Sequence, residues 1–135
     1  MDKFRCITSI QTRYSDFDML GHLNNAVYVT YYETARIDYF KTIGWELEQI
    51  TNVVARSTIN FIKPVRPGDE LKVKTRISSI GNTSFTMDYI LISEKTEEIL
   101  NKATTVQVCV DRSDQRPISV PEDIREKINS FESRV

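Results

Sequence analysis

The 135-residue sequence has little of several things that mark common protein classes. It contains one histidine and two cysteines, Cys6 and Cys109, which are too few and too far apart in the chain for a metal cage or a disulfide scaffold. We interpret both cysteines as small core residues. No apolar run approaches the ~20 residues that cross a bilayer, and the start MDKFRCITSI lacks the apolar segment of a signal peptide. We therefore expect a cytoplasmic protein with no membrane insertion, no metal and no other cofactor.

Neither sign of charge is in excess. The chain has 18 Lys and Arg against 19 Asp and Glu, and its formal net charge is −1. The basic residues are spread along the chain, so the sequence offers no electrostatic case for a nucleic-acid partner. A hydrophobic content of 40% and a charged content of 27% are typical of a globular protein. The length predicts a single domain that spans residues 1–135.

The segment from residue 24 to residue 44 has the period of a long α-helix. At 100° per residue, aromatic and aliphatic side chains fall on one stripe and polar side chains on the opposite side. Asn24 or Asn25 is a suitable N-cap, and Gly44 is a suitable residue just beyond the C-terminus. The expected apolar stripe consists of Tyr28, Tyr32, Ala35, Tyr39 and Ile43.

After the helix the period changes to two residues, which is typical of β-strands. In residues 70–77, for example, Leu, Val, Thr and Ile alternate with Lys and Arg. Gly81 and Asn82 predict a tight hairpin turn after this strand. A short amphipathic helix is expected at 119–131, with a capping box formed by Ser119 and Glu122. The expected strands are 4–14, 53–62, 70–77, 84–92 and 103–110.

This order of elements predicts an α+β fold, because one long helix can bury its stripe only against the sheet that the strands build. Five antiparallel strands cannot easily cover both sides of themselves. One face or edge is therefore left for solvent or for a second subunit, and we expect a homo-oligomer.

The stretch RYSDFDMLGHLNNAVYVTYYETAR, followed by KPVRPGDEL and CVD, resembles the hotdog-fold acyl-CoA thioesterases, most closely the 4-hydroxybenzoyl-CoA thioesterase-like branch. The resemblance runs from about Ile7 to Pro121. It implies a five-stranded antiparallel sheet wrapped around one long central helix, an acyl-CoA substrate, and a homodimer or homotetramer with the active site at the subunit boundary. The segment DMLGHLNN also resembles acyl-ACP thioesterases, in which an aspartate, an asparagine and a histidine alternate. This chain keeps Asp18 and His22 but has Leu20 in place of the asparagine.

The resemblance makes Asp18 the catalytic carboxylate; from the residues alone, an Asx turn before the helix is the alternative. Thioester hydrolysis needs a nucleophile, or a base for water, and an ionised aspartate can serve as either. His22 could polarise the thioester carbonyl or orient water. The resemblance also implies that the backbone N–H of Asn25 is the oxyanion donor, at a helix start that favours negative charge and that the same residue could cap. Asp16 shares a face with Asp18 only if the strand persists that far, and we expect a capping or solvated role for it.

Two charged residues, Glu33 and Arg36, lie on or beside the apolar arc of the long helix. A charged residue on such an arc needs a partner, and the i,i+3 spacing lets these two pair. We expect an ion pair between them, either structural or at a dimer interface.

By the same resemblance, the turn GNTSF is where relatives hold the CoA nucleotide. We therefore assign Gly81, Asn82, Thr83 and Ser84 to substrate binding, since backbone N–H groups at a glycine turn can bind phosphate. A hairpin turn with no ligand role is the alternative. Further candidates for the phosphates, among which the sequence does not select, are Lys63, Arg66, Arg112 and Arg116.

The sequence therefore predicts an enzyme that hydrolyses an acyl-CoA thioester to a carboxylic acid and free CoA. Three alternatives stay open: a hotdog hydratase or dehydratase, an acyl-ACP thioesterase, and a non-catalytic domain that binds acyl thioesters.

Overall fold

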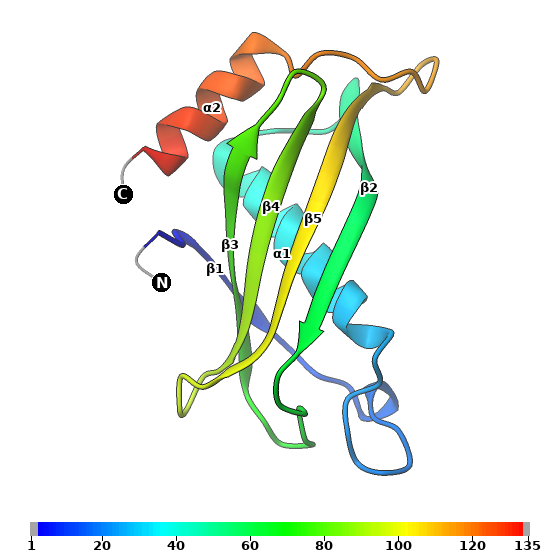
Figure 1. The fold of residues 1–135 in the computed structure, drawn as a ribbon, viewed down its shortest axis with the longest axis vertical. Helices are drawn as coiled ribbons and strands as arrows, with labels where there is room; N and C mark the ends of the chain where they lie inside the picture. The colour runs from blue at the N-terminus through cyan, green and yellow to red at the C-terminus, as the bar shows by residue number, and fades with distance from the viewer. Residues whose placement is uncertain (1–2, 134–135) are drawn as a thin grey trace.

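The computed structural model describes residues 3–133, and its elements follow the expected order of strand, long helix, four strands and short helix (Figure 1). A short 3-10 helix, η1, is the one addition to that order. The elements are β1 (Cys6–Ile10), η1 (Tyr14–Asp16), α1 (Val27–Ile43), β2 (Ile50–Phe61), β3 (Leu71–Ile80), β4 (Ser84–Ser93), β5 (Ile99–Asp111) and α2 (Glu122–Glu132).

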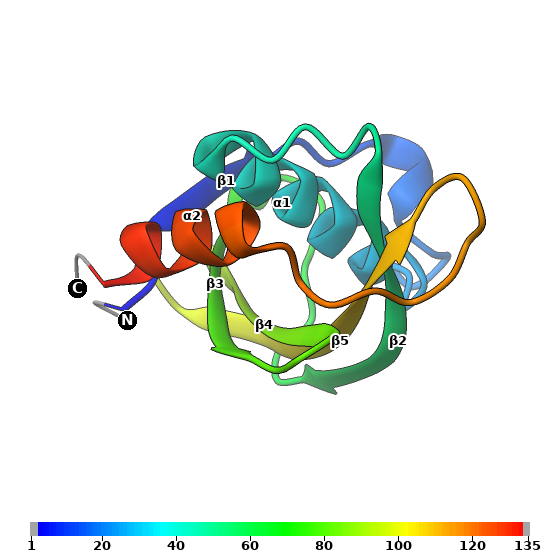
Figure 2. The same cartoon turned by 90° about the horizontal axis from the view of Figure 1, so that it is seen from above.

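The strands form one five-stranded sheet in the order β1-β3-β4-β5-β2, and every neighbouring pair is antiparallel. The sheet curves, and α1 lies on its concave side (Figure 2). The expected α+β architecture is therefore confirmed, with a sheet wrapped around one long helix. The two edge strands are β1 and β2, of which β2 is the longer.

The first strand is shorter than the expected 4–14. Ile10 pairs with Leu71, which is where β3 begins, so no partner strand extends the pairing beyond that point. The chain then turns through η1. As a result Asp16 and Asp18 do not share a strand face: Asp16 is buried and Asp18 is exposed.

The helix α1 buries a wider face than the expected stripe. Tyr28, Tyr32, Ala35 and Tyr39 are buried as predicted, and Ile43 is partly buried. Tyr31 and Phe40 are buried as well. The Tyr31 hydroxyl meets Asp16 in the segment before the helix, and the Phe40 ring packs against Trp45 and Phe85.

The prediction for α1 is correct at its C-terminal end and wrong at its N-terminal end. Gly44 follows the last helical residue with φ 84°, and its N–H donates to the carbonyl of Lys41, so the glycine end is confirmed. The expected N-cap is wrong. The cap position is Ala26, and Asn24 instead accepts the Ala26 N–H on its Oδ1 at 3.0 Å in an Asx turn.

The capping box predicted for α2 is also wrong. The N-cap is Pro121, and the Ser119 hydroxyl donates to Asn82 Oδ1 at 3.1 Å in the neighbouring hairpin. The apolar side of α2 is as expected: Ile124 and Ile128 are buried, and Phe131 packs partly buried against the core.

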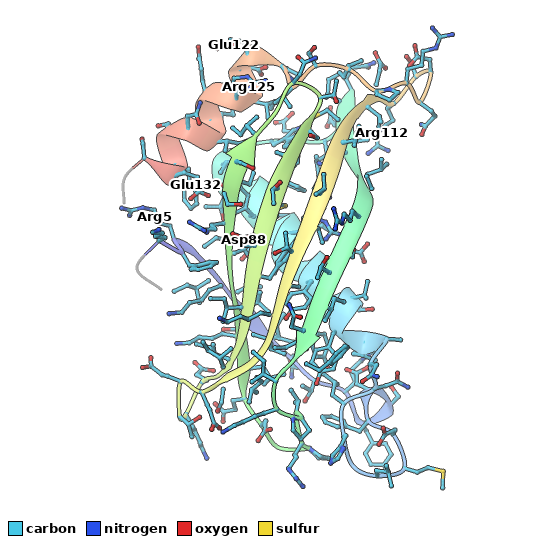
Figure 3. All side chains as sticks on the ribbon, viewed as in Figure 1. Arg5, Asp88, Arg112, Glu122, Arg125 and Glu132 are labelled. Carbon is cyan, nitrogen blue, oxygen red and sulfur yellow. The ribbon has the colours of Figure 1, made fainter. Side chains whose placement is uncertain are left out.

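The last residue of α2 fixes this helix to the sheet. Glu132 lies where α2 ends beside β3 (Figure 3), and its Oε2 accepts the Ile77 N–H at 2.9 Å and the Tyr39 hydroxyl. The Ile77 N–H needs this acceptor because β1 pairs with β3 only as far as Thr75, so that edge of β3 has no strand partner at Ile77. Glu132 thus satisfies two donors that the sheet and α1 leave unpaired.

We predict that Glu132→Ala lowers the free energy of unfolding by about 1–3 kcal/mol, because two partly buried donors lose their acceptor. Glu132→Gln keeps an oxygen in the same place and should cost less. Urea unfolding followed by circular dichroism measures both variants. An alanine variant as stable as the wild type would contradict this role.

Candidate active site

A cavity of about 360 Å³ lies at the end of the sheet where β2 ends and α1 begins. The loop before α1 and the connection after β2 are joined there by the Leu23 N–H, which donates to the Val65 carbonyl at 2.9 Å. The cavity brings together all three residues predicted to be catalytic. Its lining residues are Asp18, His22, Leu23, Asn25, Tyr28, Phe61, Ile62, Lys63 and Pro64.

Asp18 is an exposed carboxylate held by its own loop. Its Oδ1 accepts the N–H of Leu20 at 2.9 Å and of His22 at 3.2 Å, and the Asp18 N–H donates to the His22 carbonyl. The Asx turn is therefore present, and it occupies one of the two carboxylate oxygens. No described residue donates a hydrogen bond to Oδ2. Asp18 also borders a second cavity, of about 550 Å³, on the side of Gly68.

Asp16 differs from Asp18 in its burial and in its side-chain partners. It is 1% exposed, so a solvated role is wrong. It does cap, since its Oδ2 accepts the Arg13 N–H at 2.9 Å. Burial raises its pKa, but hydrogen bonds from Tyr31 and Arg13 and the charge of Arg13 lower it by more, and the net pKa lies below the ordinary value. Asp16 is thus an ionised group with no room for a substrate atom.

His22 and Asn25 flank Asp18 on the wall of the cavity. His22 is partly exposed and no described residue hydrogen-bonds its ring, so both ring nitrogens are free for a ligand or water. Asn25 is exposed, and its N–H has no acceptor among the described residues. That N–H sits two residues before the first residue of α1, where the helix dipole favours a negative charge.

The apolar wall of the cavity was not predicted as part of a site. Tyr28 and Phe61 meet edge to face with ring centroids 5.1 Å apart, and Ile62 follows directly. Phe61 and Ile62 are about half exposed, at 52% and 49%. The signal in the sequence was an apolar pair at the end of a predicted strand, which reads equally well as core.

The hairpin assigned to substrate binding lies at the other end of the sheet. It joins β3 to β4 at the end where β5 finishes, and the loop that holds Asp18 is at the opposite end (Figure 1). Gly81 and Asn82 are engaged by the C-terminal region: Arg125 donates to the Gly81 carbonyl at 3.0 Å, and the Val120 N–H donates to the Asn82 carbonyl at 2.8 Å. The Thr83 carbonyl accepts the Cys109 N–H. Within one chain, Gly81, Asn82, Thr83 and Ser84 do not meet Asp18.

The candidate phosphate partners divide in the same way. Lys63 lines the Asp18 cavity and pairs with Glu98, and Arg66 follows it in the connection between β2 and β3. Arg112 lies at the far end, after β5 (Figure 3), where it donates to the Leu47 carbonyl at 2.8 Å. Arg116 is in the same segment, and its N–H donates to the Asp114 carboxylate in an Asx turn.

The predicted ion pair on α1 does not form within the chain. Glu33 is exposed, and Arg36 donates instead to the hydroxyl of Tyr89, at 3.2 Å. That hydroxyl also shares a hydrogen bond with Thr105 at 2.8 Å. The buried phenol therefore supplies the partner that Arg36 needs, and Glu33 is left at the surface.

Neither cysteine thiol is suited to act as a nucleophile. Cys6 and Cys109 are buried, as expected, and burial raises the pKa of each thiol to about 11, so neither is a thiolate at neutral pH. Among residues 3–133, no group of three or more His, Cys, Asp and Glu side chains could hold a metal ion. Nor is any helix in that range long and apolar enough to span a membrane.

Comparison with known proteins agrees with this geometry. A thioesterase from Thermus thermophilus, solved in complex with coenzyme A and Zn, is 36% identical and superimposes with a TM-score of 0.86 over 100% of both chains. The acyl-CoA thioester hydrolase YbgC of Escherichia coli O6:H1 is 29% identical over 85% of this chain and 89% of its own. The chloroplastic acyl-acyl carrier protein thioesterase ATL3 of Arabidopsis thaliana is 28% identical over 90% of this chain and 66% of its own.

A family model described as the thioesterase-like superfamily matches residues 12–128. That range contains the whole of the Asp18 loop, α1 and the four strands that follow it. The fold is the hotdog arrangement expected from the resemblance, shared end to end with a solved thioesterase. This chain therefore belongs to the thioesterase-like superfamily.

Proposed function

We propose that this protein hydrolyses an acyl-CoA thioester to a carboxylic acid and free CoA. The observation that carries the proposal is the single cavity that collects a free carboxylate oxygen on Asp18, the ring of His22 and the unpaired N–H of Asn25 at the start of α1. A base or nucleophile beside a donor for a developing oxyanion is what acyl transfer requires.

In the reaction, the oxygen of a water molecule ends on the acyl carbon and the carbon–sulfur bond breaks. Asp18 either attacks that carbon itself, giving an anhydride that water then hydrolyses, or removes a proton from the attacking water. The sulfur leaves with the bonding electrons and takes up a proton to give the CoA thiol. The Asn25 N–H stabilises the negative charge on the carbonyl oxygen, and His22 polarises that carbonyl or orients the water.

The cavity walls suit an acyl thioester. Tyr28, Phe61 and Ile62 line the cavity with apolar surface for the acyl group. Lys63, which also pairs with Glu98, is the lining residue whose ammonium group would meet a phosphate. The names of the relatives support CoA as the carrier in some cases and acyl carrier protein in another. Release of free thiol from matched acyl-CoA and acyl-carrier-protein substrates, read with a thiol-reactive dye, decides between the two carriers. Loss of enoyl absorbance without thiol release would instead support a hydratase, and binding without turnover a non-catalytic domain.

A second copy of the chain would complete the site. The edge strand β2 is exposed along most of its length, with Val53 47% and Val54 43% exposed. A two-fold axis that paired β2 with β2 of a second copy would run the strands antiparallel. The far end of one chain, with Gly81 and its hairpin, would then approach the Asp18 end of the other. This supports a homodimer whose two sites each draw on both chains.

We place the activity in the cytoplasm. Both cysteines are free and buried, which is typical of proteins kept in a reducing compartment. A net charge of −1 gives no electrostatic attraction to nucleic acid, so the substrate and a second copy of the chain are the partners we propose.

We predict that Asp18→Asn folds normally and loses about 10²–10⁴-fold in kcat, because the amide keeps an oxygen for the Leu20 and His22 N–H groups but lacks the charge. Asp69→Asn is the matched control, since Asp69 also accepts a turn N–H, from Arg66 at 2.8 Å, at the same end of the molecule. Initial rates of thiol release measure both variants. Comparable kcat in Asp18→Asn and the wild type would remove Asp18 from the mechanism.

The oxyanion donor can be tested by a pair of changes at one position. Asn25→Pro deletes an N–H that no described residue accepts. Asn25 is the second residue of the turn that the Val27 N–H closes on the Asn24 carbonyl at 2.9 Å, a position that proline suits, so the fold should tolerate the change. Asn25→Ala keeps the N–H. We expect the proline variant to lose about 10²–10³ in kcat relative to the alanine variant. Equal turnover at saturating acyl-CoA, in variants with matching circular dichroism, would place the donor elsewhere, for instance on His22.

The proposed assembly can be tested with two variants, each of which introduces one lysine on a different edge strand of the sheet. Val53→Lys places like charges on opposite sides of the proposed β2 contact, whereas Ile7→Lys changes an equally exposed residue, at 52%, on β1. We expect the wild type and Ile7→Lys to sediment as a dimer or larger at micromolar concentration, and Val53→Lys to dissociate and lose activity. A fully active wild-type monomer would contradict the proposed assembly.

A further inference from the structure

The loop that carries Asp18 is anchored by a carboxylate that does not face the cavity. Asp16 is 1% exposed, and its two oxygens accept four hydrogen bonds. One comes from the Tyr31 hydroxyl on α1 at 2.6 Å, and the others from the Arg13 N–H at 2.9 Å and the Arg13 guanidinium at 2.9 and 3.2 Å. The Arg13 side chain is itself 71% exposed, so Tyr31 is the one buried partner of this carboxylate.

The backbone of Asp16 also closes the loop. Its carbonyl accepts the N–H of Asn24 at 2.9 Å, and Asn25 is the next residue along the chain. Between these two points the chain makes the turn in which the Asp18 N–H donates to the His22 carbonyl and the His22 N–H donates to the Asp18 carboxylate. Asp16 and Asn24 therefore hold the two ends of this turn together, and the hydrogen bond from Tyr31 fixes Asp16 to α1.

We infer that Asp16 and Tyr31 are positioning residues for the reaction proposed above, on which this inference rests. The hydrogen bond from Tyr31 to Asp16 sets the distance between the Asp18 carboxylate and the Asn25 N–H. Asp18 lies in the loop that Asp16 closes, and Asn25 directly follows that loop. Among the described residues, no hydrogen bond ties the Asp18 carboxylate or the Asn25 N–H to a side chain of α1. Near-attack geometry is sensitive to shifts of about 1 Å, which can cost ~10²-fold in rate.

A role in stability alone makes a different prediction. A buried hydrogen bond that only stabilises the fold lowers the melting temperature of a variant but leaves kcat unchanged well below that temperature. A positioning bond lowers kcat at temperatures where the variant is fully folded. It also leaves KM nearly unchanged, because the apolar wall formed by Tyr28 and Phe61 belongs to other elements.

The test compares two buried tyrosines of α1. Tyr31→Phe removes the hydroxyl that binds Asp16, and Tyr39→Phe removes the buried hydroxyl that binds Glu132 at the α2 end of the helix. Both changes delete one O–H that donates to a carboxylate. We expect Tyr31→Phe to lower kcat about 10-fold to 100-fold with KM within about threefold. Tyr39→Phe should lower the melting temperature and leave kcat within about twofold.

Two further measurements complete the test. Asp16→Asn should lower kcat at least as far as Tyr31→Phe but less than Asp18→Asn, and adding Tyr31→Phe to Asp16→Asn should change little, because both act through one hydrogen bond. Hydrogen exchange of the Asp18 and Asn24 amides should be faster in Tyr31→Phe and unchanged in Tyr39→Phe. If Asp16→Asn does not fold, Tyr31→Phe still carries the test.

The outcomes separate this inference from the proposed function. Wild-type kcat in a folded Tyr31→Phe, together with an inactive Asp18→Asn, overturns the positioning role and leaves the proposed function intact. An active Asp18→Asn overturns the proposed mechanism. If the wild type hydrolyses no thioester, the kinetic comparison fails with the proposed function, and unchanged amide exchange in Tyr31→Phe would then overturn the anchoring of the loop as well.

Discussion

The aromatic face of α1 can be buried only on the concave side of the sheet, and the rest of the structure follows from this constraint. Tyr32, Ala35 and Tyr39 are all nearly inaccessible there, at 3%, 0% and 0%. Once the helix is fixed along that groove, its N-terminus is fixed at one end of the sheet. The unpaired N–H groups at this end, and with them the cavity beside Asp18, are therefore a product of core packing rather than of the loop alone.

The two aspartates of the loop show how one short segment separates structure from chemistry. Asp16 is held by Arg13 and Tyr31 and keeps a pKa below its ordinary value, so it stays charged inside the protein. Asp18 lies beyond the turn, with one oxygen used by the turn and one free. The buried, hydrogen-bonded carboxylate of Asp16 holds the loop in place, and the exposed carboxylate of Asp18 on the same loop is available to a substrate.

The sequence was sufficient for the fold and for the loop that brings Asp18, His22 and Asn25 to one cavity, and insufficient for the apolar wall and wherever tertiary contacts decide. Periodicity located α1, α2 and all five strands, and the loop motif placed Asp18, His22 and Asn25 together. The burial of Asp16 could not be predicted, because it depends on where β1 ends its pairing with β3 and the chain turns. The caps failed for a related reason: Asn24 and Ser119 are good cap residues locally, but each makes a different bond once neighbouring segments are in place. Arg36 likewise donates a hydrogen bond to Tyr89, which lies 53 residues away in the chain, and does not pair with Glu33 on the preceding turn.

The open edge of β2 links the site to assembly. In one chain the Asp18 cavity is bounded by β2 at Phe61, which is 52% exposed, so part of its wall faces solvent. The glycine hairpin and Arg112 lie at the opposite end of the same sheet. An acyl-CoA is long enough to need both an apolar wall and several phosphate contacts. Within one chain, Lys63 lies beside that wall, whereas the glycine hairpin and Arg112 lie at the far end. An antiparallel β2 contact between two copies is the arrangement that would cover the exposed wall and bring the two ends together, because it turns one sheet end for end against the other. Assembly would then complete the site as well as protect an edge strand.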